Sequence, residues 1–194
     1  NAELSQLPHM DYGTENNYIL HGNQIVPLTI DHYLSYCGVN YNTIYTIGCP
    51  FSCTYCSNDV CARLDPHYRR IRMPSVDHII GELSQVKAEI PHLRSVVFMD
   101  DAFLFVKSGV MQEFATRYRK EIGLPFAVLG ANPVSITEEK IRLLINAGLN
   151  RVRMGIQSGS PKILDLYNRK TPLESIINAS RILADHRSAL IPSG

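Results

Sequence analysis

Strand-like and helix-like stretches alternate along most of this chain, and this order strongly restricts how it folds. Short apolar runs rich in β-branched residues occupy 42–48, 94–100, 126–130 and 151–156. Apolar residues at helical spacing follow them, starting near residues 75, 107, 137 and 160. Strands that alternate with helices form a parallel sheet covered by helices on right-handed crossovers. The sequence therefore predicts an α/β fold.

Residues typical of helix ends mark the boundaries of these helices. Ser75 is placed to cap the first long helix, and Pro91 ends it. Thr137 is placed to cap a later helix, which Gly148 stops. The run Thr-Pro-Leu-Glu at 171–174 predicts a capping box with proline at the first helical position.

Three cysteines, Cys49, Cys53 and Cys56, follow the first predicted strand with the spacing C-x3-C-x2-C. Thiolates in such a group bind iron–sulfur clusters or zinc. A closed structural zinc site needs four ligands, commonly as two separated pairs, and a second pair is missing from this sequence. Three thiolates can hold three irons of a cubane cluster and leave the fourth iron open for a small molecule. The spacing therefore predicts an active site.

Two further cysteines, Cys37 and Cys61, lie outside this spacing and are interpreted as buried small hydrophobic residues or incidental thiols. Cys61 is the nearest additional thiol, and ligation by it would close the site. A non-catalytic cluster or zinc module, serving binding or electron transfer, therefore remains an alternative.

The motif, with Tyr55 just before its last cysteine, resembles that of the radical S-adenosylmethionine enzymes. The resemblance implies a [4Fe-4S] cluster at Cys49, Cys53 and Cys56, with Tyr55 close to the cofactor. It also implies that the open iron binds S-adenosylmethionine, and that one electron cleaves it to a 5′-deoxyadenosyl radical. An electron donor such as flavodoxin or ferredoxin and a small-molecule or peptide substrate are then expected.

The same resemblance implies a fold, the partial (β/α)6 TIM-like barrel of the radical S-adenosylmethionine type. Residues 42–194 would form this core, which ends after about four βα units and is therefore incomplete at the C-terminus. A fifth strand is expected to begin within 188–192. Because the chain is short for a complete barrel enzyme and begins with Asn, we expect a piece of a larger protein.

Two acidic residues, Asp100 and Asp101, end the second predicted strand. In parallel barrels the functional groups gather where strands end. Many family members carry Gly-Gly-Glu here, where it holds the methionyl amino group, and an acidic character at this position carries over. We expect at least one of the two carboxylates to touch cofactor or substrate; the alternative is that one caps the following helix.

The ends of the third and fourth predicted strands supply further polar candidates. The run 155–160 resembles the Gly-Ile-Glu-Ser-Gly-Ser run of several radical enzymes, with Gln157 in place of the acid. Arg153 and Gln157 are expected to contact the cofactor, and Asn132 is a candidate on position alone. The glycines of this run also fit a tight turn.

Charge and hydropathy restrict the remaining possibilities. A formal net charge of +1 argues against non-specific electrostatic binding to nucleic acid or anionic membranes. The basic segment 68–72 is interpreted as solvated surface. No apolar run reaches membrane-spanning length, the N-terminus lacks a signal-peptide pattern, and five cysteines are too few for a disulfide scaffold. We therefore expect a cytoplasmic protein.

The segment 1–41 resembles the linker that follows a cobalamin-binding domain. With the runs 70–75, 98–103 and 155–160, it resembles the cobalamin-dependent methyltransferase and cyclase branch of the family. The resemblance implies cobalamin bound by a domain that is not in this chain. A cobalamin-free relative, such as a methylthiotransferase or a coproporphyrinogen oxidase relative, is the alternative enzyme.

Overall fold

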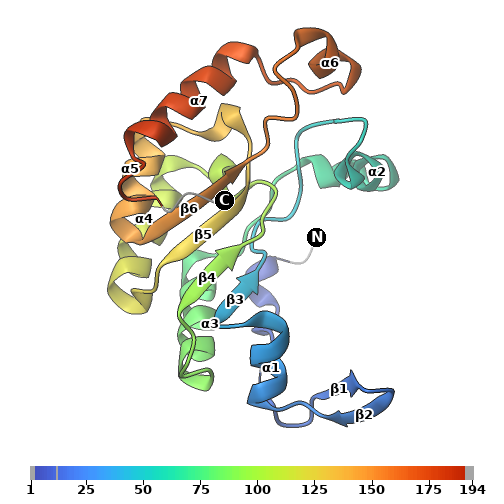
Figure 1. Ribbon diagram of the computed structural model, residues 1–194, viewed down its shortest axis with the longest axis vertical. Helices are drawn as coiled ribbons and strands as arrows, with labels where there is room; N and C mark the ends of the chain where they lie inside the picture. The colour runs from blue at the N-terminus through green and yellow to red at the C-terminus, as the bar shows by residue number, and fades with distance from the viewer. Residues whose placement is uncertain (1–2, 12, 191–194) are drawn as a thin grey trace.

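Four parallel strands form the central sheet of the computed structural model, which describes residues 3–11 and 13–190 (Figure 1). The strands lie side by side in chain order: β3 (Asn40–Thr43), β4 (Ser95–Phe98), β5 (Phe126–Ala131) and β6 (Leu149–Met154). Each strand pairs in parallel with the next, so the predicted α/β architecture is confirmed.

The connections between these strands contain the expected helices. In chain order the α-helices are α1 (Ile30–Cys37), α2 (Ser57–Leu64), α3 (Val76–Glu89), α4 (Ser108–Arg117), α5 (Glu138–Ala147), α6 (Pro161–Leu166) and α7 (Leu173–Asp185). Helices α4, α5 and α7 lie together on one side of the sheet, while α2 and α6 lie beyond the ends of the strands (Figure 1). The carboxyl ends of the strands therefore face α2 and α6.

Aromatic rings fill the space between the sheet and its helices. The Phe98 ring stacks on Phe103 at a centroid distance of 4.8 Å and meets Phe126 edge-on at 5.4 Å. Phe114 and Tyr118 complete this cluster, and all five side chains are buried. Because large buried rings dominate core energetics, this cluster fixes how the helices sit on the sheet.

Most of the predicted helix ends are confirmed. The Ser75 hydroxyl accepts a hydrogen bond from the His78 amide, and Thr137 caps α5 in the same way. Gly148 ends α5 with a φ of 117°, a conformation that glycine adopts without strain. The capping box at 171–174 is wrong, because the Thr171 hydroxyl instead lies 3.4 Å from Asn132 Oδ1, and α7 begins without a side-chain cap.

The first strand is shorter than the sequence predicts. The apolar run 42–48 extends well past the end of β3, but the chain leaves the sheet after Thr43. The backbone N–H groups of Tyr45 and Thr46 donate to the buried carboxylate of Asp100 instead of continuing the ladder. A side chain at the end of β4 therefore ends β3.

The N-terminal part of the chain packs against the core. An antiparallel hairpin of β1 (Tyr18–His21) and β2 (Gln24–Pro27) precedes α1 and projects away from the sheet (Figure 1). Ahead of it, the Met10 amide donates to Glu82 Oε2 at 3.4 Å. The other oxygen of this buried carboxylate accepts from the hydroxyls of Tyr41 and Tyr45 at 2.7 and 2.9 Å. Glu82 thus connects α3 to β3, to the chain that follows β3, and to the N-terminal segment.

The end of the described chain does not continue as a strand. Residues 188–190 form a turn and bend after α7, and residues 191–192 of the expected fifth strand lie outside the described part. Within 3–11 and 13–190, no helix combines the length and apolar character that crossing a membrane requires.

Candidate functional site

A cavity of about 310 Å³ lies where the carboxyl ends of the strands meet the cysteine-bearing loop. Its walls come from the loop between β3 and α2, from the start of α2, from the chain after β4, and from the ends of β5 and β6 with the residues that follow them. The predicted site residues that line it are Cys49, Cys53, Tyr55, Cys56, Asp101, Asn132, Arg153 and Gln157. The fold therefore brings together residues more than 100 positions apart in the chain.

The three cysteines of the motif are free thiols, and all line this cavity. Among the described residues, no three Cys, His, Asp or Glu side chains could together hold a metal ion. In a cubane cluster each thiolate binds a different iron, so the expectation of a cluster rests on the spacing of the three cysteines and on the cavity that they share.

A glycine allows the chain to enter this loop. Gly48 has a φ of 110°, and a Cβ there would lie 2.5 Å from the carbonyl oxygen of Arg70 and 2.7 Å from that of Tyr68. The Cys49 amide then donates to the Tyr68 carbonyl at 3.0 Å. The segment after α2 thus fixes the start of the loop through its backbone.

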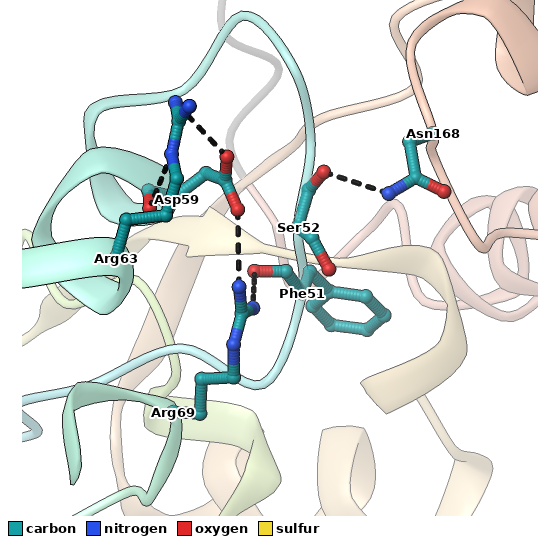
Figure 2. A network of polar contacts seen from close by, with 6 residues as sticks. All are labelled: Phe51, Ser52, Asp59, Arg63, Arg69 and Asn168. Atoms are coloured by element: carbon teal, nitrogen blue, oxygen red, sulfur yellow. Dashed lines mark hydrogen bonds and ion pairs between the residues drawn. The ribbon is translucent and has the colours of Figure 1, made fainter. Parts of the chain in front are cut away.

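Arg69 also holds the loop, contrary to the expectation that the basic segment 68–72 is only solvated surface. Its guanidinium donates to the Phe51 carbonyl at 3.2 Å and to Asp59 Oδ1 at 3.1 Å (Figure 2). Asp59 also pairs with Arg63 one helical turn on, at 3.2 Å. Charge-assisted bonds of this kind are stronger than neutral ones.

The two neighbouring aspartates after β4 differ in position. Asp101 lines the cavity and accepts a hydrogen bond of 2.6 Å from Asn58 Nδ2. Asp100 does not line it: this side chain is fully buried and its Oδ1 accepts from the Tyr45 and Thr46 amides and the Thr46 hydroxyl. The expectation of a carboxylate at the cavity therefore applies to Asp101, while Asp100 anchors the chain that leads into the cysteine loop.

Asn132, after β5, lines the cavity, and its side-chain oxygen already takes part in hydrogen bonds within the protein. Its Oδ1 accepts from the Val134 amide at 3.1 Å and caps the short turn Pro133–Ser135. The same oxygen lies 3.4 Å from the Thr171 hydroxyl. Only its amide nitrogen is therefore available to a ligand.

After β6, the chain curves around the cavity at Gly155. A Cβ at this glycine would lie 2.8 Å from Gln157 Nε2, so the absence of a side chain makes room for the amide. Gln157 has a φ of 70°, which is uncommon for a residue other than glycine and is seen often at functional sites. Arg153 and Gln157 are both exposed, and both line the cavity.

Arg169 is a cavity residue that the sequence did not indicate. Its Nη2 donates to the Gly155 carbonyl at 2.6 Å, and its Nη1 lies 3.8 Å from Cys53 Sγ. Its Nε is buried and has no partner within the described part of the chain. The residue follows a short helix and matches no part of the motifs, so only the folded structure reveals its position.

The electrostatic environment of Cys49 favours its neutral thiol. Burial raises the pKa of the Cys49 thiol, and the charges of Asp101 and of the other two cysteines raise it further. Burial also raises the pKa of Tyr55, while Arg169 lowers it. Iron binds thiolates, so cluster binding would release protons at this loop.

Comparison with known proteins agrees with this architecture. A sequence model of the Radical SAM superfamily matches residues 43–190. An uncharacterised methyltransferase of Pyrococcus horikoshii is 31% identical over 142 residues, covering 72% of this chain and 29% of the relative. The match to the family model covers most of the chain, and the chain belongs to the radical S-adenosylmethionine superfamily.

Solved structures share the fold at low sequence identity. One is the radical S-adenosylmethionine methyltransferase TsrM from Kitasatospora setae, with tryptophan substrate and a cofactor analogue bound. It has a TM-score of 0.64 at 17% identity, over 81% of this chain and 30% of that chain. The cobalamin-dependent radical enzyme OxsB, with aqua-cobalamin and S-adenosylmethionine bound, has a TM-score of 0.62 at 18% identity. The match covers 86% of this chain and 27% of OxsB. This chain thus spans less than a third of the length of these proteins.

Proposed function

We propose that this chain is the core of a radical S-adenosylmethionine enzyme, with a [4Fe-4S] cluster held by Cys49, Cys53 and Cys56. One observation carries the proposal: the free thiols of one loop line the same cavity as polar groups from three consecutive strand ends. The bound and reduced cluster would supply the electron that cleaves S-adenosylmethionine to a 5′-deoxyadenosyl radical.

The residues of the cavity offer a partner to each polar part of the cofactor. The Asp101 carboxylate suits the cationic amino group, because an oppositely charged pair shielded from water attracts strongly. The guanidinium groups of Arg153 and Arg169 suit the carboxylate. Gln157 and the amide nitrogen of Asn132 suit hydroxyl groups. Tyr55 provides a half-exposed aromatic surface beside the cluster loop.

We further propose that the full protein belongs to the cobalamin-dependent methyltransferase or cyclase branch. The identity with the Pyrococcus horikoshii methyltransferase and the fold shared with TsrM and OxsB support this branch. Residues 1–41 would be the linker to a domain that binds cobalamin, and residues 42–194 would form the core. A small-molecule or peptide substrate and an electron donor such as flavodoxin or ferredoxin complete this proposal, together with a cytoplasmic location.

Electron paramagnetic resonance tests the core of the proposal. The protein is reconstituted anaerobically with iron and sulfide, reduced, and measured with and without S-adenosylmethionine. We expect a four-iron signal that shifts when the cofactor is added, and loss of the signal in Cys49→Ala. A four-iron signal that does not change when the cofactor is added to the full-length protein would refute an open iron.

A closed, non-catalytic cluster is the second candidate, and the position of Cys61 argues against it. Cys61 lies within α2, outside the residues that line the cavity. Cys61→Ala should therefore keep the four-iron signal and its response to the cofactor. Loss of the cluster in this variant would instead favour a closed site with Cys61 as the fourth ligand.

A further inference from the structure

The short helix α6 ends in a Schellman turn whose central residue is Asn168. The Arg169 amide donates to the Leu164 carbonyl at 2.8 Å, and the Asn168 amide donates to the Asp165 carbonyl at 2.9 Å. Asn168 has a φ of 48°, the left-handed conformation that this motif requires. Glycine is the usual residue at this position because it adopts this conformation without strain.

The side chain of Asn168 makes a contact that glycine could not make. Its Nδ2 donates a 3.0 Å hydrogen bond to the Ser52 carbonyl, 116 residues away in the sequence (Figure 2). Ser52 directly precedes Cys53 in the cysteine loop. An asparagine here therefore serves both the turn that ends α6 and the loop that carries the thiols.

The neighbours of Asn168 contact the same stretch of the loop. The Thr54 amide donates to the Tyr167 carbonyl at 3.0 Å, and Arg169 Nη1 lies 3.8 Å from Cys53 Sγ. Three consecutive residues of the turn, 167–169, thus meet three consecutive residues of the loop, 52–54. Arg69 holds the Phe51 carbonyl, as described above, so both sides of the loop are fixed (Figure 2).

The loop depends on these outside contacts because it has little structure of its own. Residues 51–53 belong to no helix or strand, and the backbone bond from the Cys56 amide to the Cys53 carbonyl closes only the following turn. A cluster binds best when its ligands are ordered beforehand, because ordering them on binding costs free energy.

We propose that Asn168 is a positioning residue that orders the cysteine loop for its cluster. The inference rests on the proposed function, since it assumes that the loop holds a cluster. Asn168 does not line the cavity, and it acts through the Ser52 carbonyl on the position of Cys53.

The variant Asn168→Gly separates the side chain from the backbone. Glycine keeps the left-handed turn and removes only the amide that bonds Ser52. Asn23→Gly is the matched control, because Asn23 is also left-handed, with a φ of 63°, and lies in the turn of the distant β1–β2 hairpin. The full-length proteins are reconstituted anaerobically, and iron loss to a chelator is followed together with thermal unfolding of the cluster-free forms.

We expect Asn168→Gly to lose iron about fivefold faster than the wild type, the effect of one lost hydrogen bond. Asn23→Gly should lose iron at the wild-type rate, and cluster-free Asn168→Gly should unfold only slightly below the wild type, as expected from one lost hydrogen bond. Equal rates of iron loss in Asn168→Gly and the wild type would overturn the assignment while leaving the cluster in place, and so would a fall in unfolding temperature too large for one hydrogen bond. A wild-type protein that binds no iron would instead refute the proposed function together with this inference.

Discussion

The carboxylates of Asp100 and Asp101, adjacent in the chain, face opposite environments. Asp100 is fully buried against the backbone after β3, whereas Asp101 is exposed to the cavity beside Asn58. Because consecutive residues near the end of a strand point in opposite directions, one position serves the fold and the next serves the site. The same substitution at the two positions should therefore change the stability of the protein by different amounts.

Asp100→Ala should lower the free energy of unfolding by about 2–4 kcal/mol, because it leaves the Tyr45 and Thr46 amides buried without an acceptor. Urea denaturation of the cluster-free protein measures this change. Asp101→Ala is the control, and it should cost less than about 1 kcal/mol because this side chain is exposed. Equal losses in the two variants would contradict separate roles.

Stability should fall as pH rises through the titration of Asp100. Burial raises the pKa of this carboxyl, and hydrogen bonds from Thr46 and Tyr45 only partly oppose the effect. The folded protein thus keeps the proton to higher pH than the unfolded chain, where the aspartate pKa is about 3.9. Since the folded state binds more protons in this window, the contribution of Asp100 to stability decreases above about pH 4.

Asp100→Asn removes this titration and provides the test. Urea denaturation from about pH 4 to about pH 6 should show a smaller decrease in the variant than in the wild type. Parallel curves for the two proteins would show that the folded-state pKa of Asp100 is not raised.

Gly130→Ala should destabilise the protein by about 3 kcal/mol or more. A Cβ at this position would lie 1.9 Å from the Asp100 carbonyl oxygen, so β5 and the chain after β4 would have to separate. Gly109→Ala is the matched control, because nothing lies within 4 Å of its Cβ position in α4. Chemical denaturation should find the control unchanged or slightly more stable, and a tolerated Gly130→Ala would contradict the close approach.

Tyr118→Phe should leave stability unchanged or raise it by up to about 1 kcal/mol. The Tyr118 hydroxyl is buried in the aromatic cluster and has no hydrogen-bond partner among the described residues. Removing a polar group that is buried without a partner removes a desolvation cost. Tyr41→Phe, which loses the 2.7 Å bond to Glu82, should instead cost about 1 kcal/mol. Thermal unfolding of both variants measures the two effects. A clear loss of stability in Tyr118→Phe would contradict the prediction for that residue.

Local sequence signals predicted the sheet and most helix ends, because periodicity and capping depend on neighbouring residues. The cysteine spacing and the strand ends likewise predicted most of the cavity lining. The early end of β3 was not predictable, because a carboxylate 55 positions away from Tyr45 removes the backbone from the ladder. Arg169 and Asn168 were missed for the same reason, since their partners in the cysteine loop become neighbours only after folding.

The N-terminal segment packs on α3, so a protein shortened to the family boundary would lose contacts of the core. The sequence match to the family begins at residue 43. Residues before this position nevertheless contact the core: the Ser75 amide at the start of α3 donates to the Ser5 hydroxyl at 2.7 Å. The Met10 amide donates to Glu82, which also accepts from the hydroxyls of Tyr41 and Tyr45. A protein trimmed to the family boundary would expose one side of a buried carboxylate and free the start of α3. A unit that keeps these bonds must include residue 5, so the region matched by the family model is shorter than the region that these contacts hold together.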